Sequence, residues 1–350
     1  MKQKDYLPAF FRRYPFAEPR DAVKLCYQAA FGAEHLLLDI PAAREYFDEE
    51  FSAVIAGDCN IFEPISPDYY RINLAAWKNE ALPQSWLFEM FRLTASGGTP
   101  EDSLDVFNDC LDAVDALANT GFAPFTIDEW RVFFKDYDKT APKPVHHSTS
   151  YRAKAHPAYR IVAAQYARLV PMLRKINKLT AETKIIAIDG RSASGKTTLA
   201  EALREITGAG IIHMDDFFLP AGLRTETRLN TPGGNVHHER FLSEVIPCLR
   251  SNEPFSYGVF DCETMATGMP REVAASCLRI VEGAYSHHPA LGDYMDLRVF
   301  SDIDADLQLQ RIKERDGDYT EVFTSRWIPL EEQYLCSFSV ADKADIIIRP

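Results

Sequence analysis

The stretch TKIIAIDGRSASGKTTLAEAL, residues 183–203, joins an apolar run, a glycine-rich loop and a helix-forming segment. Residues 185–188 are apolar at every position, which is typical of a strand buried on both faces of a parallel sheet. Residues 190–197, GRSASGKT, fit the pattern G-x-x-x-x-G-K-[ST] without a mismatch, and residues 198–203 favour a helix. A strand followed by this loop and a helix is the context that defines a P-loop.

The loop predicts a site for the β- and γ-phosphates of a nucleotide. Consecutive backbone N–H groups and the start of the following helix supply positive potential there. Lys196 adds a charge, and the Thr197 hydroxyl is suited to ligate Mg²⁺. We predict that the nucleotide is bound by the residues of the loop and the first helical turn: Gly190, Arg191, Ser192, Ala193, Ser194, Gly195, Lys196, Thr197 and Thr198.

Length and composition favour a cytoplasmic protein of two domains. The chain has 350 residues, and its 46% hydrophobic content is enough for a sizeable core. Seven cysteines are scattered without a C-x-x-C pair, which indicates reduced thiols rather than disulfides or a zinc site. We find no signal peptide in the first residues and no apolar run near the roughly 20 residues that span a bilayer. We therefore expect no membrane partner.

The negative charge is concentrated in the second half of the chain. Of a formal net charge of −13, residues 1–180 hold 21 Lys and Arg against 24 Asp and Glu, and residues 181–350 hold 17 against 27. An acidic P-loop domain is a poor partner for a polyanion, so nucleic acid is disfavoured. A small, weakly charged or neutral acceptor fits better, and the sequence leaves a homo-oligomer open.

We predict a mostly helical domain of unknown role over residues 1–178 and a P-loop domain over residues 179–350. In the first domain, the stretches 20–38 and 101–118 carry apolar residues at helical spacing. We assign no chemistry to its histidines: His35 is expected in the core or at the surface.

Two segments precede the predicted boundary. Residues 139–156, rich in Pro, Ser and His, predict a loop, in which His146 and His147 are expected to be solvated. Residues 157–178 predict a helix that Pro171 interrupts.

The second domain alternates strand and helix, which predicts an α/β fold with a parallel sheet covered by helices on both faces. The expected strands are 184–189, 210–214, 278–282, 296–301 and 344–349.

Acidic residues end two of these strands, where open parallel sheets bind their ligands. In GIIHMDDFFLP (210–220), Asp215 is the candidate base that takes a proton from an acceptor hydroxyl, and Asp216 is a candidate Mg²⁺ ligand through water. In LRIVEGAYSHHP (278–289), Glu282 is a second candidate for Mg²⁺. The alternatives are a helix cap or solvated acid for the first pair and a plain turn for the last.

Two arginines form a candidate lid. In LQLQRIKERDG, Arg311 and Arg315 are four residues apart and share a helix face. Both guanidiniums could close on the transferring phosphoryl group and stabilise its charge. The alternative is a solvated helix whose arginines pair with neighbouring acids.

The second half resembles the uridine kinase family of P-loop kinases, a group that includes phosphoribulokinase and bacterial pantothenate kinase. The shared segments, in order over residues 183–350, are GRSASGKT, MDDFF, GGNVHHERF, PFSYGVFD, VEGAYS and RIKERDG. The resemblance implies phosphorylation of a hydroxyl with ATP and Mg²⁺, and Asp215 matches the catalytic acid. It also implies acceptor-binding residues: Phe217, Phe218, Asn235, His237, Tyr257 and Phe260.

The sequence departs from the family at His237, where members carry an Asp that binds ribose hydroxyls. This weakens the nucleoside assignment more than the kinase assignment. The sequence therefore predicts an ATP-dependent small-molecule kinase whose acceptor is a nucleoside such as uridine. The alternatives are a kinase for a sugar or a pantothenate-like alcohol, or a non-catalytic ATP-sensing module. No N-K-x-D motif follows the P-loop, which disfavours a GTPase.

Overall fold

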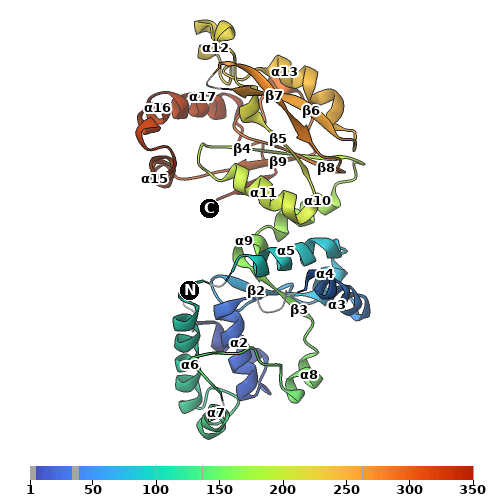
Figure 1. Cartoon of the computed structure of the whole chain (residues 1–350), viewed down its shortest axis with the longest axis vertical. Helices are drawn as coiled ribbons and strands as arrows, with labels where there is room; N and C mark the ends of the chain where they lie inside the picture. The colour runs from blue at the N-terminus through green and yellow to red at the C-terminus, as the bar shows by residue number, and fades with distance from the viewer. Residues whose placement is uncertain (1–4, 34–38, 99, 136, 262–263, 350) are drawn as a thin grey trace. The chain divides into compact units, whose positions relative to one another are not determined.

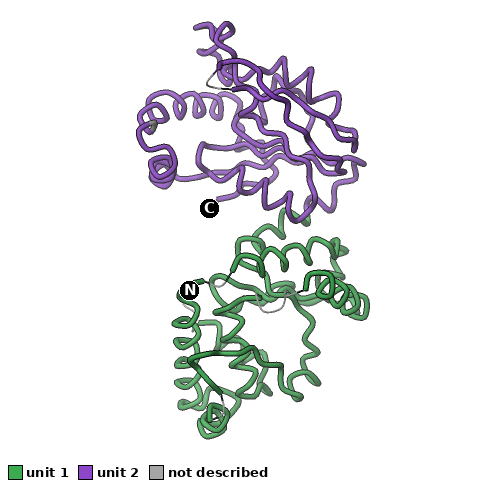
Figure 2. The backbone as a smooth tube through the Cα atoms, in the orientation of Figure 1, with its two compact units in different colours: residues 1–174 green, residues 175–350 purple. Residues whose placement is uncertain are grey.

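The computed structural model describes residues 5–33, 39–98, 100–135, 137–261 and 264–349. The chain divides into two compact units, residues 1–174 and 175–350 (Figure 2). The division falls within helix α10 (Val170–Lys178), and the predicted boundary after residue 178 lies at the end of that helix. Within the described residues, no helix has the length and apolar character needed to cross a membrane.

The first unit is mostly helical, as predicted, and also contains a small sheet. Its helices are α1 (Tyr6–Arg13), α2 (Pro19–Phe31), α3 (Ile40–Ala53), α4 (Leu74–Asn79), α5 (Gln84–Ser96), α6 (Ser103–Asn119), α7 (Ile127–Phe133), α8 (Thr149–Ala155) and α9 (Ala164–Ala167). Three antiparallel strands, β1 (Phe62–Pro64), β2 (Tyr69–Asn73) and β3 (Tyr159–Ala163), pair in the order β1-β2-β3. Helices α2 and α6 cover the two predicted helical stretches, except that residues 34–38, with His35, lie outside the described residues.

The segment before the boundary departs from both predictions made for it. The predicted helix over 157–178 is wrong in its first part, because Tyr159–Ala163 pairs with β2 as a strand before α9 and α10 follow. This segment includes Ile and Val, whose branched side chains suit a half-buried strand. The predicted loop over 139–156 ends in α8, whose first turn is capped by the Ser148 hydroxyl accepting from the Tyr151 N–H at 3.0 Å.

The second unit is built on a five-stranded parallel sheet, which confirms the predicted fold class. Its strands lie in the order β10-β9-β4-β8-β5. They are β4 (Lys184–Gly190), β5 (Gly210–His213), β8 (Leu278–Glu282), β9 (Leu297–Ser301) and β10 (Ile346–Ile348), each within or nearly within its predicted range. An antiparallel ribbon, β6 (Phe255–Asp261) and β7 (Ala266–Val273), stands apart from the sheet in hydrogen bonding.

Helices cover both faces of this sheet (Figure 1). Residues 185–188 of β4 are all fully buried. Ile185 and Ala187 belong to the core shared with α13 and α17, while the intervening residues face the opposite side, where α11 packs. The helices are α11 (Lys196–Thr207), α12 (Glu226–Asn230), α13 (His238–Glu244), α14 (Ile246–Leu249), α15 (Ala305–Asp316), α16 (Thr320–Val322) and α17 (Ile328–Phe338), with a π-helical turn at Phe323–Trp327.

Candidate active site

The P-loop bends back at a position where only glycine fits. Gly190 ends β4 with φ of 140°, and a Cβ there would lie 2.0 Å from the carbonyl oxygen of Ser301 on β9. Gly195, with φ of 92°, turns the chain into α11. A close contact at Gly190 and the positive φ at Gly195 therefore explain why the motif has glycine at these two positions. Together they turn the loop toward the start of the helix.

Two side chains of the loop are suited to hold phosphate. The Lys196 ammonium donates to the carbonyl oxygens of Gly190 and Arg191, both at 2.8 Å, so it lies across the loop. The Ser194 hydroxyl is buried and has no hydrogen-bond partner among the described residues. A phosphate oxygen would satisfy such a hydroxyl and give the lysine an anionic partner, so the residues of the loop fit a nucleotide. Thr198, by contrast, is exposed in the first turn of α11.

Glu282 joins three elements at the carboxyl end of the sheet. It ends β8, and its Oε2 accepts from the Thr197 hydroxyl at 3.2 Å. Its Oε1 lies 2.5 Å from Nδ1 of His213, the last residue of β5. A hydroxyl and a carboxylate oxygen are hard donors suited to Mg²⁺. The described residues contain no group of three or more His, Cys, Asp or Glu that could hold an ion alone, so phosphate and water oxygens would complete the shell.

Asp215 follows β5 and faces the same charges. Enclosure by the protein raises the pKa of its carboxyl, Glu282 and Asp216 raise it further, and Lys196 opposes them. The side chain nevertheless opens to solvent. Asp215 thus lies within electrostatic reach of the P-loop lysine and remains accessible to an acceptor.

Asp216 turns the other way. It is buried, and its Oδ2 accepts from the Tyr257 hydroxyl at 2.9 Å and lies 3.3 Å from an Arg271 nitrogen, both on the β6–β7 ribbon. Burial raises the pKa of its carboxyl, although both partners oppose the shift. These contacts bind Asp216 to the ribbon rather than to Thr197, so the structure favours Glu282 as the acid beside Thr197.

Three aromatic rings predicted at the acceptor are buried in the fold. Phe217 is fully buried, with its ring 5.1 Å from that of Tyr257, and both belong to the core. Phe260 is also buried, under the Arg224 guanidinium. Packing encloses these three rings in this structure, and their contact with an acceptor stays a prediction. Phe218 is half-buried, 6.4 Å from the ring of Trp327.

The loop before α13 places its polar residues in two different roles. Asn235 is buried, and its Nδ2 makes no hydrogen bond of normal geometry among the described residues, although its side chain lies beside the Tyr285 hydroxyl. His237 caps α13: its ring accepts from the Arg240 N–H at 3.3 Å and lies 3.2 Å from Glu239. Glu239 in turn pairs with Arg228 at 2.8 Å. His237 is thus engaged with its own helix.

The two lid arginines do not act as a pair. Arg311 on α15 donates to the Ala193 carbonyl oxygen at 3.1 Å and so reaches the P-loop. Arg315 pairs with Asp316 at 2.7 Å and lies over the Phe323 ring. Arg311 therefore lies against the P-loop and Arg315 pairs with a neighbouring acid, while closure of either guanidinium on the phosphoryl group stays a prediction.

Sequence reasoning missed the contacts that α17 makes with the P-loop. Glu331 is buried, and its carboxylate accepts from the Ser192 N–H at 2.9 Å and bonds the Ser192 hydroxyl. Glu332 accepts from Arg191 at 2.6 Å. No motif marks these acids in the sequence, since they come together with the loop only through the fold.

Asp189 connects the P-loop strand to helix α17 and to the loop after β8. It is fully buried at the end of β4, and its carboxylate accepts from the Tyr334 hydroxyl of α17 at 2.7 Å and from the Tyr285 and His287 N–H groups at 3.1 and 2.8 Å. These bonds fix the loop after β8 and the helix α17 against the P-loop strand.

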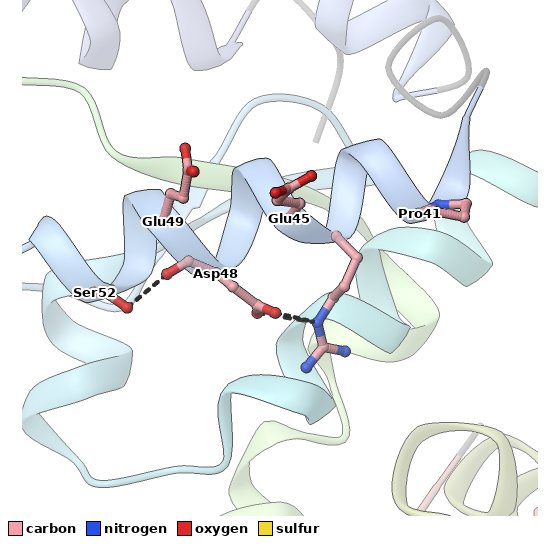
Figure 3. Close-up of a pocket in the computed structure, with 6 residues that line it drawn as sticks. Pro41, Glu45, Asp48, Glu49 and Ser52 are labelled. Carbon is pink, nitrogen blue, oxygen red and sulfur yellow. Dashed lines mark hydrogen bonds and ion pairs between the residues drawn. The ribbon is translucent and has the colours of Figure 1, made fainter.

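A surface pocket on the first unit is lined mainly by acidic side chains, which do not suit a phosphate. Figure 3 shows it over α3, where Glu45, Asp48 and Glu49 line it with Arg44, which pairs with Asp48 at 2.9 Å. Three acids against one base would repel an anion. The shape of this pocket therefore does not identify a phosphate site, whereas the residues of the P-loop do.

A P-loop at the carboxyl ends of a parallel sheet, with acids beside it, is typical of P-loop nucleotide-binding proteins, the class that includes the P-loop kinases. No family model matches the chain. The uridine kinase of Chlamydia pneumoniae is 31% identical over 170 residues, covering 43% of this chain and 75% of that protein. The uridine kinase of Staphylococcus epidermidis is 30% identical over 192 residues, covering 48% of this chain and 87% of that protein.

The chain therefore belongs to the uridine kinase family, as the sequence motifs predicted. Among solved structures, a chain from Bacillus stearothermophilus described as a possible uridine kinase matches with a TM-score of 0.41 and 22% identity, covering 53% of this chain and 98% of that one. The family membership supports a small-molecule kinase.

Proposed function

We propose that this chain transfers the γ-phosphoryl group of ATP to a hydroxyl of a small molecule in the presence of Mg²⁺, with a nucleoside such as uridine as the acceptor. The observation that carries the proposal is the meeting of Lys196, Thr197, Glu282 and Asp215 at the carboxyl end of one sheet. The uridine kinases named above supply the nucleoside as acceptor class.

In this proposal the P-loop binds and orients the nucleotide. Its N–H groups hold the phosphates, and Lys196 exchanges its two carbonyl partners for phosphate oxygens. Thr197 and Glu282 would hold Mg²⁺, which neutralises charge on the phosphates when bound. Arg311, whose guanidinium already contacts the loop, would turn toward the same anions.

Asp215 acts on the acceptor. The acceptor oxygen forms a bond to the γ-phosphorus, the bond to the bridging oxygen breaks and leaves ADP, and the hydroxyl proton passes to the Asp215 carboxylate. The base must be ionised, so its raised pKa shifts the acid limb of the rate to a pH above the ordinary value of 3.8. The rate is retained above that limb and lost as pH falls through it.

A second candidate is phosphorylation of another small alcohol, a sugar or a pantothenate-like compound. The burial of Phe217, Tyr257 and Phe260 favours it, because a nucleoside base needs an exposed ring on which to stack. The engagement of His237 as a helix cap favours it too, since neutral imidazole offers one acceptor where a carboxylate offers several for a ribose diol.

The experiment is a coupled ADP-release assay of the full chain with ATP, Mg²⁺ and a panel of nucleosides, sugars and pantothenate-like alcohols. We expect ADP release that depends on one class of acceptor, and we expect that class to be the nucleosides. Turnover with sugars or pantothenate-like alcohols alone would replace the nucleoside assignment. ATP binding without acceptor-dependent turnover would identify a non-catalytic ATP-sensing module and refute the kinase.

A further inference from the structure

The first unit encloses a polar cavity of about 110 Å³ to which the kinase chemistry assigns no role. Its walls come from α1, the β1–β2 pair and the segment from α8 to β3, and they include Arg13, Glu63, Arg71, Tyr14, Tyr151 and Tyr159. At about 30 Å³ per water molecule, this volume holds a few waters or a small molecule of a few heavy atoms. Segments that are distant in the sequence thus converge on one enclosed space.

Arg71 is the buried charge of this cavity. Only 1% of the residue is exposed, and its guanidinium lies 4.6 Å from the centre of the Tyr159 ring. It donates to Gln28 Oε1 from Nε at 2.9 Å and from Nη2 at 2.6 Å, and to Glu63 Oε1 from Nη1 at 2.9 Å. A guanidinium has five N–H groups, so these three bonds leave two for an occupant of the cavity.

The charges around the cavity are unbalanced toward positive. Glu63 is shared: it accepts from Arg71 and from the Tyr14 hydroxyl at 2.9 Å, and Arg13 lies 3.7 Å away. Lys24 adds a third base nearby. Burial and the positive charge of Arg71 lower the pKa of its ammonium to about 8, although Asp21 opposes them. Glu63 and the buried Asp21 offset part of this charge, and the cavity lining itself holds Arg13 and Arg71 against Glu63.

A hydrogen-bonded network holds Arg71 in place. Asp21 is fully buried and lies 3.0 Å from Nδ1 of His147, whose Nε2 lies 2.8 Å from the Tyr159 hydroxyl. The Tyr159 hydroxyl accepts from Gln28 Nε2 at 3.1 Å, and Gln28 receives the two bonds from Arg71. Each partner constrains the orientation of the next, so the network holds the guanidinium in one position, preorganised for a ligand.

We propose that this cavity is a binding site for a small anion bearing a carboxylate or phosphate group, with Arg71 as its buried anchor and Arg13 at its mouth. Arg13 has 43% of its side chain exposed, which suits a residue that a ligand passes on entry. The planar fork of a guanidinium matches the two oxygens of either group. The site belongs to the first unit and rests on none of the kinase assignments.

The test is calorimetric titration of the full chain with acetate, inorganic phosphate and methylammonium, in the Lys196→Ala background, which weakens phosphate binding at the P-loop; variants of the cavity then assign the binding that remains. We expect saturable binding of acetate or phosphate, and the tighter of the two identifies the group that the site prefers. Arg71→Met should weaken binding by about tenfold or more, the scale for losing a charge-assisted hydrogen bond.

Arg13→Gln is the second variant, because removing Arg71 from a buried network could unfold the unit. This substitution should weaken anion binding by about threefold or more, a smaller effect than that expected for the buried Arg71. Arg12→Gln is the matched control: this neighbour on α1 is also exposed but lies over the Phe122 ring instead of the cavity, and its loss should leave affinity unchanged.

Three results would overturn the proposal. They are no saturable binding of either anion to the Lys196→Ala chain, binding that is equally affected by Arg12→Gln and Arg13→Gln, and tight binding of methylammonium that Glu63→Gln abolishes. The last would show that the cavity selects cations through Glu63.

Discussion

The P-loop and the cavity of the first unit are both built for charge, and they are assembled in opposite ways. The P-loop uses eight consecutive residues, 190–197, and presents mainly backbone N–H groups. The cavity uses side chains from Arg13 to Tyr159 that only the fold brings together. A site made by backbone leaves a sequence pattern, whereas a site made by scattered side chains leaves none.

The perturbed pKa values of the two regions also point in opposite directions. Beside the P-loop, burial raises the pKa of the Asp215 carboxyl and neighbouring acids raise it further. In the first unit, burial lowers the pKa of His147 to about 4, with Arg71 and Lys24 contributing to the decrease and Asp21 opposing it. Burial is the largest cause of both shifts, because it raises the pKa of an acid and lowers that of a base whatever ligand each region binds.

The largest difference should come from Lys196→Ala. Losing the loop's charge should cut acceptor-dependent turnover by at least about 10²-fold, the scale for one preorganised stabilising group. The exposed Lys343→Ala serves as the control for charge alone. Circular dichroism should show the same fold for both variants. Near-normal turnover by a folded Lys196→Ala protein would remove the P-loop from the chemistry.

The two lid arginines should differ in their effect on kcat by about threefold or more. Arg311→Gln removes a guanidinium that contacts the P-loop, and kcat should fall about tenfold, since one charge-assisted contact to phosphate is lost. Arg315→Gln breaks only an exposed pair with Asp316 and should change kcat by less than about threefold. Equal losses in steady-state assays would mean that the helix closes with both arginines.

The sequence predicted the second unit well because its signals are local. The apolar run 185–188, the motif 190–197 and the acids at the ends of β5 and β8 each depend on neighbouring residues. Strand β3 was mistaken for a helix because its pairing with β2 joins residues about 90 positions apart. His147 was expected in solvent, yet it is buried against Asp21, 126 positions away, a contact that no pattern records.

The same limit applied to the site. Asp215 and Glu282 could be found because strand ends gather in one place. The burial of Phe217 and Tyr257 depends on how α13 packs against the β6–β7 ribbon. Glu331 contacts Ser192 although the two residues are 139 positions apart in the sequence.

Glu331→Gln should tighten ATP binding by about threefold to tenfold. The isosteric amide can keep a bond to Ser192 while removing a negative charge from the phosphate loop, worth about 1 kcal/mol at an intermediate dielectric. Calorimetry at pH 8 should show a larger gain for ATP than for ADP, and for ADP than for AMP. Glu332→Gln, at a more exposed position, is the matched control and should have less effect. Weaker ATP binding by Glu331→Gln would make this acid a support of the loop instead.

The smallest expected effect is a dependence of first-unit stability on pH. Because the pKa of folded His147 is about 4 and its ordinary value is 6.5, the unfolded chain binds more protons between these values. Stability is therefore full above about pH 6.5 and falls as pH decreases toward 4, by about 1 kcal/mol between pH 7 and 5.5.

Chemical denaturation across this range should show that decline for His146→Gln, the exposed neighbour, but much less of it for His147→Gln. An unchanged slope in His147→Gln would assign the decline to other groups.

The central claim, that the acids following β5 divide their work, is tested most directly by comparing Asp215→Asn with Asp216→Asn. ATP affinity should stay within about threefold of wild type for Asp215→Asn, while its acceptor-dependent ADP release should fall by about 10²-fold or more, because the base is lost and the shape is kept. Asp216→Asn, bonded to Tyr257 and Arg271, should retain more activity. Near-normal turnover by Asp215→Asn, with Asp216→Asn inactive, would contradict the account.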